Sequence, residues 1–396
     1  MVVTGLGVVS SIGIGWQEFW KHLLEGKSGI TKITSFDVSQ HLHHNAGEIK
    51  NFNPNDFMNR RKAMSIGRSS QLAIAASKLA IKDSGFDITD DNRDYFGVCI
   101  GTTAGEINVV EKYHDQPENM RASNKTSLGA IPSSTISINV ANENCVSGYL
   151  NVFGDACSAG NYSIGRAYDL ISLDKAKFAL AGGADGFSRV VFTGFDRMLS
   201  VAPDKCQPFD KNRQGMIPGE AGAILFIESL DSAVHRGANI YAEILGYGLS
   251  ANGTHMTTPN ENGIKRSILK ALQYSNISPD SVDYISAHGT GTKENDKAEC
   301  SALSMIFDEK LSNIPVSSIK SMLGHTMGAA SAIEAIACCL AVQENKVPPT
   351  INYEEPDPEC NIDCVPNQCR DHNVSVALNN SQAFGGNNAS LVLRGV

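Results

Sequence analysis

Residues 283–292 read Asp-Tyr-Ile-Ser-Ala-His-Gly-Thr-Gly-Thr, and they repeat the pattern of residues 94–103, Asp-Tyr-Phe-Gly-Val-Cys-Ile-Gly-Thr-Thr. Each begins with an apolar run of strand length and ends in a glycine-threonine turn. A helical stretch precedes each one, residues 71–84 in the first case and 264–274 in the second. Helices alternating with buried strands are typical of α/β proteins, so this pattern predicts an α/β fold.

A second repeat suggests that the fold is built twice. Val2-Val-Thr-Gly-Leu-Gly7 resembles Glu243-Ile-Leu-Gly-Tyr-Gly248, and each reads as a strand that runs into a glycine turn. The separations in the two repeats are about 190 to 240 residues, which predicts two similar halves, residues 1–235 and 236–396. An ordinary doubly wound sheet without duplication remains the alternative.

Composition limits the class of protein. The 396 residues carry a formal net charge of −9, which argues against nucleic acid as a partner but leaves room for a local basic patch that binds an acidic carrier protein. No apolar run reaches about 18 residues, and the first residues lack a basic region, so we expect neither a membrane span nor a signal peptide. The ten scattered cysteines predict free thiols and a cytoplasmic location.

Cys157 is the first candidate for chemistry. It lies in Asp155-Ala-Cys-Ser-Ala-Gly160, just before a helix whose apolar face includes Ile164, Ala167 and Ile171. A cysteine at a helix N-terminus is expected to favour the thiolate, and its small neighbours let a substrate carbonyl approach the backbone. A buried structural cysteine is the alternative.

Two histidines in glycine turns complete the outline of an acyl-transfer site. His288 precedes Gly-Thr-Gly-Thr, where Thr290 and Thr292 offer hydroxyl groups to an amide-bearing arm. His325 closes Lys-Ser-Met-Leu-Gly-His and begins an apolar stretch, residues 328–342, that we expect to be a buried core helix. Either histidine could instead be structural.

Glu334 is the one charge in that apolar stretch, and a buried carboxylate needs a partner. Lys320 is the expected partner, although a surface-facing Glu334 is equally compatible with the sequence. Near the C-terminus, Ala383-Phe-Gly-Gly-Asn-Asn388 forms a glycine turn between strand-like residues. Backbone N–H groups in such a turn can form half of an oxyanion hole, or the turn can be a plain hairpin.

Other kinds of site are disfavoured. A metal site of His288, Asp296, Glu299 and His325 has no recognised ligand spacing. The three cysteines of residues 360–369 offer too few ligands for zinc, and Gly5-Leu-Gly7 is not a full dinucleotide fingerprint. We therefore expect no metal and no cofactor.

Taken together, these motifs resemble the β-ketoacyl-acyl-carrier-protein synthases, specifically the type II elongating ketosynthases of the thiolase superfamily. The likeness runs nearly end to end and is carried by eight motifs in order: Val2-Val-Thr-Gly-Leu-Gly, Asp155-Ala-Cys-Ser-Ala-Gly, Leu180-Ala-Gly-Gly-Ala-Asp, Pro208-Phe-Asp-x-x-Arg-x-Gly, Ala287-His-Gly-Thr-Gly-Thr, Lys320-Ser-Met-x-Gly-His, Val347-Pro-Pro-Thr-Ile-Asn and Ala383-Phe-Gly-Gly-x-Asn.

The resemblance implies a thiolase-like, duplicated, five-layered α-β-α-β-α fold and a decarboxylative Claisen condensation. Cys157 would carry an acyl group taken from a phosphopantetheine arm, and His288 and His325 would support decarboxylation of malonyl carrier protein. The other implied roles are oxyanion donation by the backbone of Cys157 and Phe384, gating by Phe384, ordering of the site by Lys320 and Glu334, and binding of the pantetheine arm by Thr290 and Thr292.

Departures from the family pattern concern the acyl pocket and its gate. Ala383 replaces a glycine and Asn387 a threonine beside Phe384, and the segment 185–199, which contains the pocket residue Phe195, looks about three residues short. Ala104 stands where a bulkier residue is common, which predicts a roomier pocket.

The variants Thr292-x-x-Asn-Asp and Cys206-x-Pro-Phe-Asp look like ketosynthases of type II polyketide and polyene pathways. Such an enzyme forms a homodimer or pairs with a chain-length-factor-like subunit, and either is expected here. The alternatives are a cysteine-dependent thioester hydrolase or acyltransferase, and a largely non-catalytic chain-length subunit. Retention of Cys157 argues against the last of these.

Overall fold

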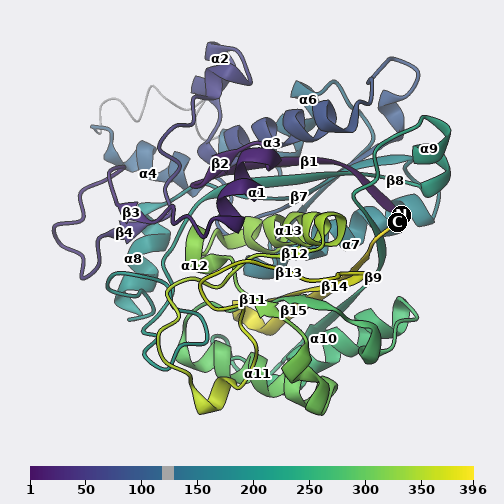
Figure 1. The fold of residues 1–396 in the computed structure, drawn as a ribbon. Coiled ribbons are helices and arrows are strands. Elements are labelled where there is room, and N and C mark those ends of the chain that lie inside the picture. The colour runs from purple at the N-terminus through teal and green to yellow at the C-terminus, as the bar shows by residue number, and fades with distance from the viewer. Residues whose placement is uncertain (118–128) are drawn as a thin grey trace.

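A computed structural model describes residues 1–117 and 129–396 (Figure 1). Its N-terminal half-sheet has the strand order β1-β8-β7-β5-β6. β8 is antiparallel to both β1 and β7, whereas β7, β5 and β6 run parallel. The strands are β1 (Val2–Ser10), β5 (Phe96–Gly101), β6 (Tyr149–Phe153), β7 (Phe178–Asp185) and β8 (Ala221–Glu228).

The C-terminal half-sheet repeats that order and those directions. Its order is β9-β15-β14-β10-β11, with β15 antiparallel to both neighbours and β14, β10 and β11 parallel. A short antiparallel contact between β1 and β9 joins the two into one 11-stranded sheet, which also includes β2 (Gly13–Ile14) on β1. The strands are β9 (Ala242–Ala251), β10 (Tyr284–Ser286), β11 (Val316–Ser317), β14 (Val376–Gln382) and β15 (Asn387–Arg394).

Helices form three further layers around and between the half-sheets (Figure 1). α7 (Ala159–Ser172) and α13 (Ala330–Glu344) lie between them, and each contacts strands of both halves. α3 (Arg68–Ser84) and α6 (Thr135–Glu143) cover the outer face of the first half-sheet. α10 (Glu261–Tyr274), with α11 (Lys293–Phe307) beside it, covers that of the second. This is the expected five-layered α-β-α-β-α arrangement.

α13 lies at the centre because apolar residues occur on every side of it, and Glu334 is the one charge among its buried residues. Every residue from Ala330 to Val342 is buried. Among the described residues, Met327–Glu344 is the one stretch with the length and apolarity of a membrane-spanning helix, and 89% of it is buried inside the protein. It is therefore a core helix, as the sequence predicted. α7 packs closely against it: a Cβ added to Gly160 would lie 2.6 Å from the backbone nitrogen of Ala332.

The remaining elements connect or flank these layers. α8 (Arg189–Arg197) contributes Phe192 to a small separate apolar cluster, whose other buried members are Ile33, Ala46, Phe187 and Val201. The remaining elements include α1 (Trp16–Leu24), α2 (Arg60–Ser65), α4 (Ile107–Asp115), α8 (Arg189–Arg197), α9 (Leu230–His235), α12 (Lys320–Leu323), β3 (Thr31–Lys32), β4 (Asn45–Ala46), β12 (Lys346–Val347), β13 (Arg370–Asp371) and the single turns η4 (Ala156–Ser158), η7 (Met327–Ala329) and η9 (Phe384–Gly386).

Candidate active site

Cys157 lies in the single turn η4, directly before α7 begins at Ala159. The preceding residue, Ala156, has φ 48°, a left-handed conformation that is costly for a residue with a side chain. The second half repeats this feature: Met327, with φ 53°, opens the turn η7 directly before α13. The equivalent of Cys157 is then Gly328, so only the first half presents a nucleophile at this position.

The structure brings the three expected residues together. Cys157 Sγ and one ring nitrogen each of His288 and His325 all lie within 4.8 Å of one another, and all three residues are buried. The two imidazole rings are 5.4 Å apart between centroids and nearly perpendicular, at 83°. All three side chains line one cavity of about 300 Å³.

Carboxylates from α11 hold the His288 turn in place. Glu299 accepts hydrogen bonds from the backbone N–H groups of His288 and Gly289, both at 2.8 Å, and Asp296 accepts from that of Thr290 at 3.1 Å. Sequence analysis assigned Asp296 and Glu299 no role beyond a disfavoured metal site. For Asp296, its place in the first turn of a helix that follows a glycine turn was the available signal, since acidic side chains are favoured there. Glu299 lies further along the helix and offers no such signal.

Lys320 supports His288 from behind the cavity. Its ammonium group donates to the His288 carbonyl oxygen at 2.6 Å and forms a buried ion pair with Glu334. The expected pairing of Lys320 with Glu334 is therefore confirmed, and the surface-facing alternative for Glu334 is wrong. Lys320 is not among the residues that line the cavity, so it acts on the site through His288 and through its charge.

Hydrogen bonds fix the tautomer of His325. Its Nδ1 accepts the backbone N–H of Met327 at 3.1 Å, so in the neutral ring Nε2 carries the proton and is a donor. Nδ1 of His288 is buried and has no hydrogen-bond partner among the described residues. An unpaired buried polar atom is costly, and it marks a position for a substrate group to occupy.

Burial decides the charges in the site. It lowers the pKa of both His288 and His325 well below the usual value, and the nearby Lys320 ammonium lowers them further, so both rings are neutral at pH 7. Burial also raises the pKa of the Cys157 thiol to about 12, although Lys320 opposes this. The expectation that the helix N-terminus would favour a resting thiolate is therefore wrong, because desolvation of the thiolate outweighs it.

The cavity wall contains most of the other expected residues. Thr290 and Thr292 line it, with their hydroxyl oxygens 2.8 Å apart, and so do Phe195 and Phe384, with ring centroids 5.8 Å apart. Ala104 is the exception: it is not among the lining residues, and its N–H donates to Asp185. The expected widening of the pocket at Ala104 has no support in this cavity.

Asp185 is a third residue whose role sequence reasoning missed. Its carboxylate accepts from the hydroxyl of Thr102 at 2.6 Å and from the backbone N–H groups of Ala104 and Gly328 at 3.1 and 2.7 Å. It thus ties the turn after β5 to the turn before α13. This tie spans 143 residues of sequence, and no local pattern could have revealed it.

The turn carrying Phe384 tolerates the unusual Ala383. Ala383 is extended, with φ −140° and ψ 154°, a conformation open to any residue. The left-handed positions are Gly385 and Gly386, at φ 84° and 79°, and both are glycine. Replacement of glycine by Ala383 therefore imposes no backbone strain on the turn.

The same three side chains are close enough to share a metal ion, and they are the one such group among the described residues. Two features oppose this use. His325 already engages Nδ1 with Met327 while Nε2 carries a proton, and the charge of Lys320 repels a cation. The donor set fits proton transfer and hydrogen bonding better than metal coordination.

A duplicated five-layered fold with one thiol and two neutral imidazoles on a common cavity defines a condensing enzyme of the thiolase-like class. The chain belongs to the beta-ketoacyl synthase family: residues 1–233 match its N-terminal domain and residues 241–354 its C-terminal domain.

Relatives match along the whole chain. The 3-oxoacyl-[acyl-carrier-protein] synthase 2 of Synechocystis sp. is 40% identical over 412 residues, covering 100% of this chain and 97% of that protein. The protein of the same name from Staphylococcus aureus is 38% identical over 409 residues, covering 100% and 98%.

Solved structures agree in fold. The ishigamide ketosynthase/chain length factor is 40% identical with a TM-score of 0.95, covering 100% of this chain and 98% of that one. A ketosynthase bound to a hexaketide, in complex with its type II polyketide synthase acyl-carrier protein, is 31% identical with a TM-score of 0.91, covering 100% and 99%.

Proposed function

We propose that this protein is a β-ketoacyl-acyl-carrier-protein synthase that condenses malonyl carrier protein with an acyl chain held on Cys157. The observation that carries the proposal is the grouping of one protonated thiol with two neutral imidazoles inside a cavity of about 300 Å³. Covalent catalysis with electrostatic stabilisation needs these groups and no redox cofactor.

In the first step, the sulfur of Cys157 attacks the thioester carbonyl of the acyl carrier. The C–S bond to pantetheine breaks, the acyl group passes to Cys157, and the thiol proton leaves with the pantetheine sulfur. The backbone N–H groups of Cys157 and Phe384 stabilise the oxyanion. Phe384, at the exposed side of the cavity, gates access to the acyl chain.

In the second step, malonyl carrier protein enters with its arm along Thr290 and Thr292. The bond to the carboxylate breaks, CO₂ leaves, and the electron pair forms an enolate whose oxygen accepts hydrogen bonds from His288 and His325. Two neutral hydrogen-bond donors can stabilise the enolate oxygen without protonating it, so the enolate carbon stays reactive. The enolate carbon attacks the Cys157 thioester and the C–S bond to Cys157 breaks, which releases a β-ketoacyl chain two carbons longer. The departing Cys157 thiolate takes up one proton from solvent, which restores the thiol.

A cysteine-dependent hydrolase or acyltransferase is the second candidate. Hydrolysis needs one histidine and a path for water, whereas the site provides two histidines and a buried Lys320–Glu334 pair that holds one of them. A non-catalytic chain-length subunit would not need the thiol. Both features favour condensation.

We propose acyl and malonyl carrier proteins as partners, in fatty-acid or type II polyketide or polyene synthesis. The support is the similarity to a 3-oxoacyl-[acyl-carrier-protein] synthase 2 and to a ketosynthase/chain length factor, each 40% identical to this chain. We also propose a dimer, either with a second copy or with a chain-length-factor-like subunit. Among the described residues β6 is the last strand of the sheet and has a partner on one side only, and Tyr149 and Leu150 on it are exposed.

Two further proposals concern organisation and location. The chain divides near residue 235 into halves that carry Cys157 and the two histidines respectively, in line with the repeated strand order. A cytoplasmic location is supported by the cysteines, because all ten are free.

Intact protein mass tests the mechanism. The wild type and Cys157→Ala are each incubated with an acyl-loaded carrier, and an acyl adduct is expected on the wild type alone. Malonyl carrier is then added, which should remove the adduct and produce β-ketoacyl carrier. Release of free acid would favour the hydrolase. An adduct that forms only with a co-expressed partner would identify a heterodimer, and no adduct in either case would refute the mechanism.

A further inference from the structure

α8 supplies a wall of the catalytic cavity but is not part of the main layers. Phe195 in α8, with Met198 and Ser200 in the turn that follows, lines the cavity. The apolar side of the helix packs, through Phe192, on a small cluster separate from the larger cores. Because this cluster is small, the position of α8, and with it this wall of the cavity, depends on the other contacts that the helix makes.

The loop before β4 provides the contacts at the C-terminal end of α8. The Asp196 carboxylate, whose side chain is 2% exposed, accepts from Nδ1 of His43 at 2.7 Å and from the N–H of Leu42 at 3.1 Å. One turn earlier, Nε2 of His41 lies 2.8 Å from the hydroxyl of Thr193. Charge-assisted bonds to a buried carboxylate are among the stronger polar contacts in proteins.

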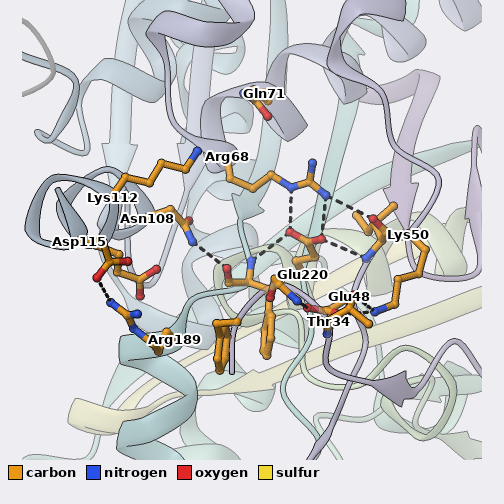
Figure 2. Close-up of a pocket in the computed structure, with 15 residues that line it drawn as sticks. Thr34, Glu48, Lys50, Arg68, Gln71, Asn108, Lys112, Asp115, Arg189 and Glu220 are labelled. Carbon is orange, nitrogen blue, oxygen red and sulfur yellow. Dashed lines mark hydrogen bonds and ion pairs between the residues drawn. The ribbon is translucent and has the colours of Figure 1, made fainter. Parts of the chain in front are cut away.

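Contacts at the other end of α8 come from α4, across an open polar cavity. Figure 2 shows Arg189 paired with Asp115 and the Asn108 side chain bonded to the backbone beside it, at the carbonyl of Phe187. Glu111 accepts from the N–H of Val190 at 2.7 Å. The cavity itself, of about 440 Å³, is lined by Arg189 at the start of the helix and by Phe187 just before it. Polar contacts therefore hold both ends of α8, in addition to the apolar packing of Phe192.

We propose that the His43–Asp196 pair is a positioning device for the catalytic cavity: it holds α8 so that Phe195 stays against Phe384 and limits the size of molecule that can reach Cys157. His43 and Asp196 touch neither the cavity nor the thiol, so they act through Phe195. The inference adds a size-selecting role to the site that the proposed function uses, and it rests on that site.

Thiol alkylation tests the inference without any carrier protein. The full chain is treated with iodoacetamide or with N-hexyl iodoacetamide, and modification of Cys157 is followed on its own peptide by mass spectrometry, because Cys145 is exposed and Cys369 partly so. Loss of one buried hydrogen bond shifts a local equilibrium roughly fivefold. We therefore expect His43→Ala to raise the ratio of hexyl to unsubstituted labelling by about fivefold.

Three variants make the result specific. Asp196→Asn leaves one acceptor oxygen for two donors, the N–H of Leu42 and Nδ1 of His43, and removes the charge, so it should raise the ratio as His43→Ala does. His235→Ala, which changes a surface histidine of α9 on the other side of the molecule in Figure 1, should leave the ratio near the wild-type value. In a Phe195→Ala background, adding His43→Ala should change nothing further, because the residue through which it acts is gone.

An unchanged ratio in His43→Ala, or an equal further rise in the Phe195→Ala background, would overturn the inference. If His43→Ala does not fold, His43→Phe retains the ring volume, removes the donor and decides the question in its place. The ratio is measured on the thiol alone. A failure of acyl transfer would therefore refute the proposed function without changing this outcome, and an unchanged ratio with normal acyl transfer would refute this inference alone.

Discussion

Replacing Lys320 by methionine should destabilise the protein and disable the site, and the two effects should be separable. The ammonium group has two buried partners, the His288 carbonyl oxygen at 2.6 Å and the Glu334 carboxylate. Lys320→Met leaves the carbonyl without a donor and the carboxyl without a counter-charge. Breaking a buried ion pair from one side costs about 3–5 kcal/mol.

A second substitution, at Glu334, should restore most of the lost stability. The pKa of Glu334 is already raised to about 7 by burial, and Lys320 is what holds it from rising further. Its Oε2 has no hydrogen-bond partner among the described residues. Adding Glu334→Leu to Lys320→Met removes this carboxyl and leaves an apolar pair beside α13. Such replacements are often neutral or stabilising, so the double variant should recover to within about 2 kcal/mol of the wild type.

Urea unfolding of the wild type, both single variants and the double variant at pH 8 measures these differences. Alkylation of Cys157 measures the site: both variants lacking Lys320 should react more slowly, because Lys320 lowers the thiol pKa. A double variant no more stable than Lys320→Met would refute the argument, as would a recovery of thiol reactivity together with stability.

The Lys320–Glu334 pair also makes the free energy of unfolding depend on pH. Because the folded-state pKa of Glu334 exceeds its unfolded value, stability should fall as pH rises from about 4.5 to 7, and Glu334→Gln should flatten that fall.

The rate of Cys157 alkylation in the wild type should rise about tenfold per pH unit from pH 7 to 9 without a plateau, because the thiol pKa is about 12; a plateau near pH 7 would contradict the proposed charge state. His288→Gln and His325→Gln should each slow CO₂ release from malonyl carrier by about 10²-fold or more while acyl transfer to Cys157 persists, which single-turnover mass measurements would follow; equal loss of both steps would contradict the roles given to the histidines. Gly160→Ala should lower the unfolding free energy by about 1–3 kcal/mol, since its Cβ would press on α13, whereas Gly194→Ala, in a helix with open space around it, should raise it by about 0.5–1 kcal/mol; thermal unfolding of the two variants side by side checks both signs.

Much of the architecture could be predicted from local pattern. The resemblance of residues 94–103 to 283–292 marks β5 and β10, which occupy equivalent places in the two half-sheets. The apolar run 328–342 predicts the core helix because no face of it is polar. The thiol and the two histidines could be grouped because each lies in a turn of small residues where a substrate can approach.

The rest depends on contacts between distant parts of the chain. Asp185 contacts Gly328, and His43 contacts Asp196 across 153 residues, so neither pair leaves a local signal. The protonation state of Cys157 was predicted incorrectly for the same reason. The start of a helix is visible in sequence, but the depth at which the fold buries that start is not, and depth sets the larger part of the free energy of ionisation.

The turns before the two central helices come from different halves of the chain, so cutting the chain between the halves separates the thiol from the two histidines. η4, in the first half of the chain, carries the Cys157 thiol, whereas His288 and His325 belong to the second half. The two halves are linked covalently only through the segment after α9. A chain severed between residues 236 and 240 would yield one fragment with a nucleophile and no imidazole partner, and another with the reverse. Activity regained on mixing such fragments would report their docking directly, which makes the protein a natural candidate for a split reporter whose signal is carbon–carbon bond formation.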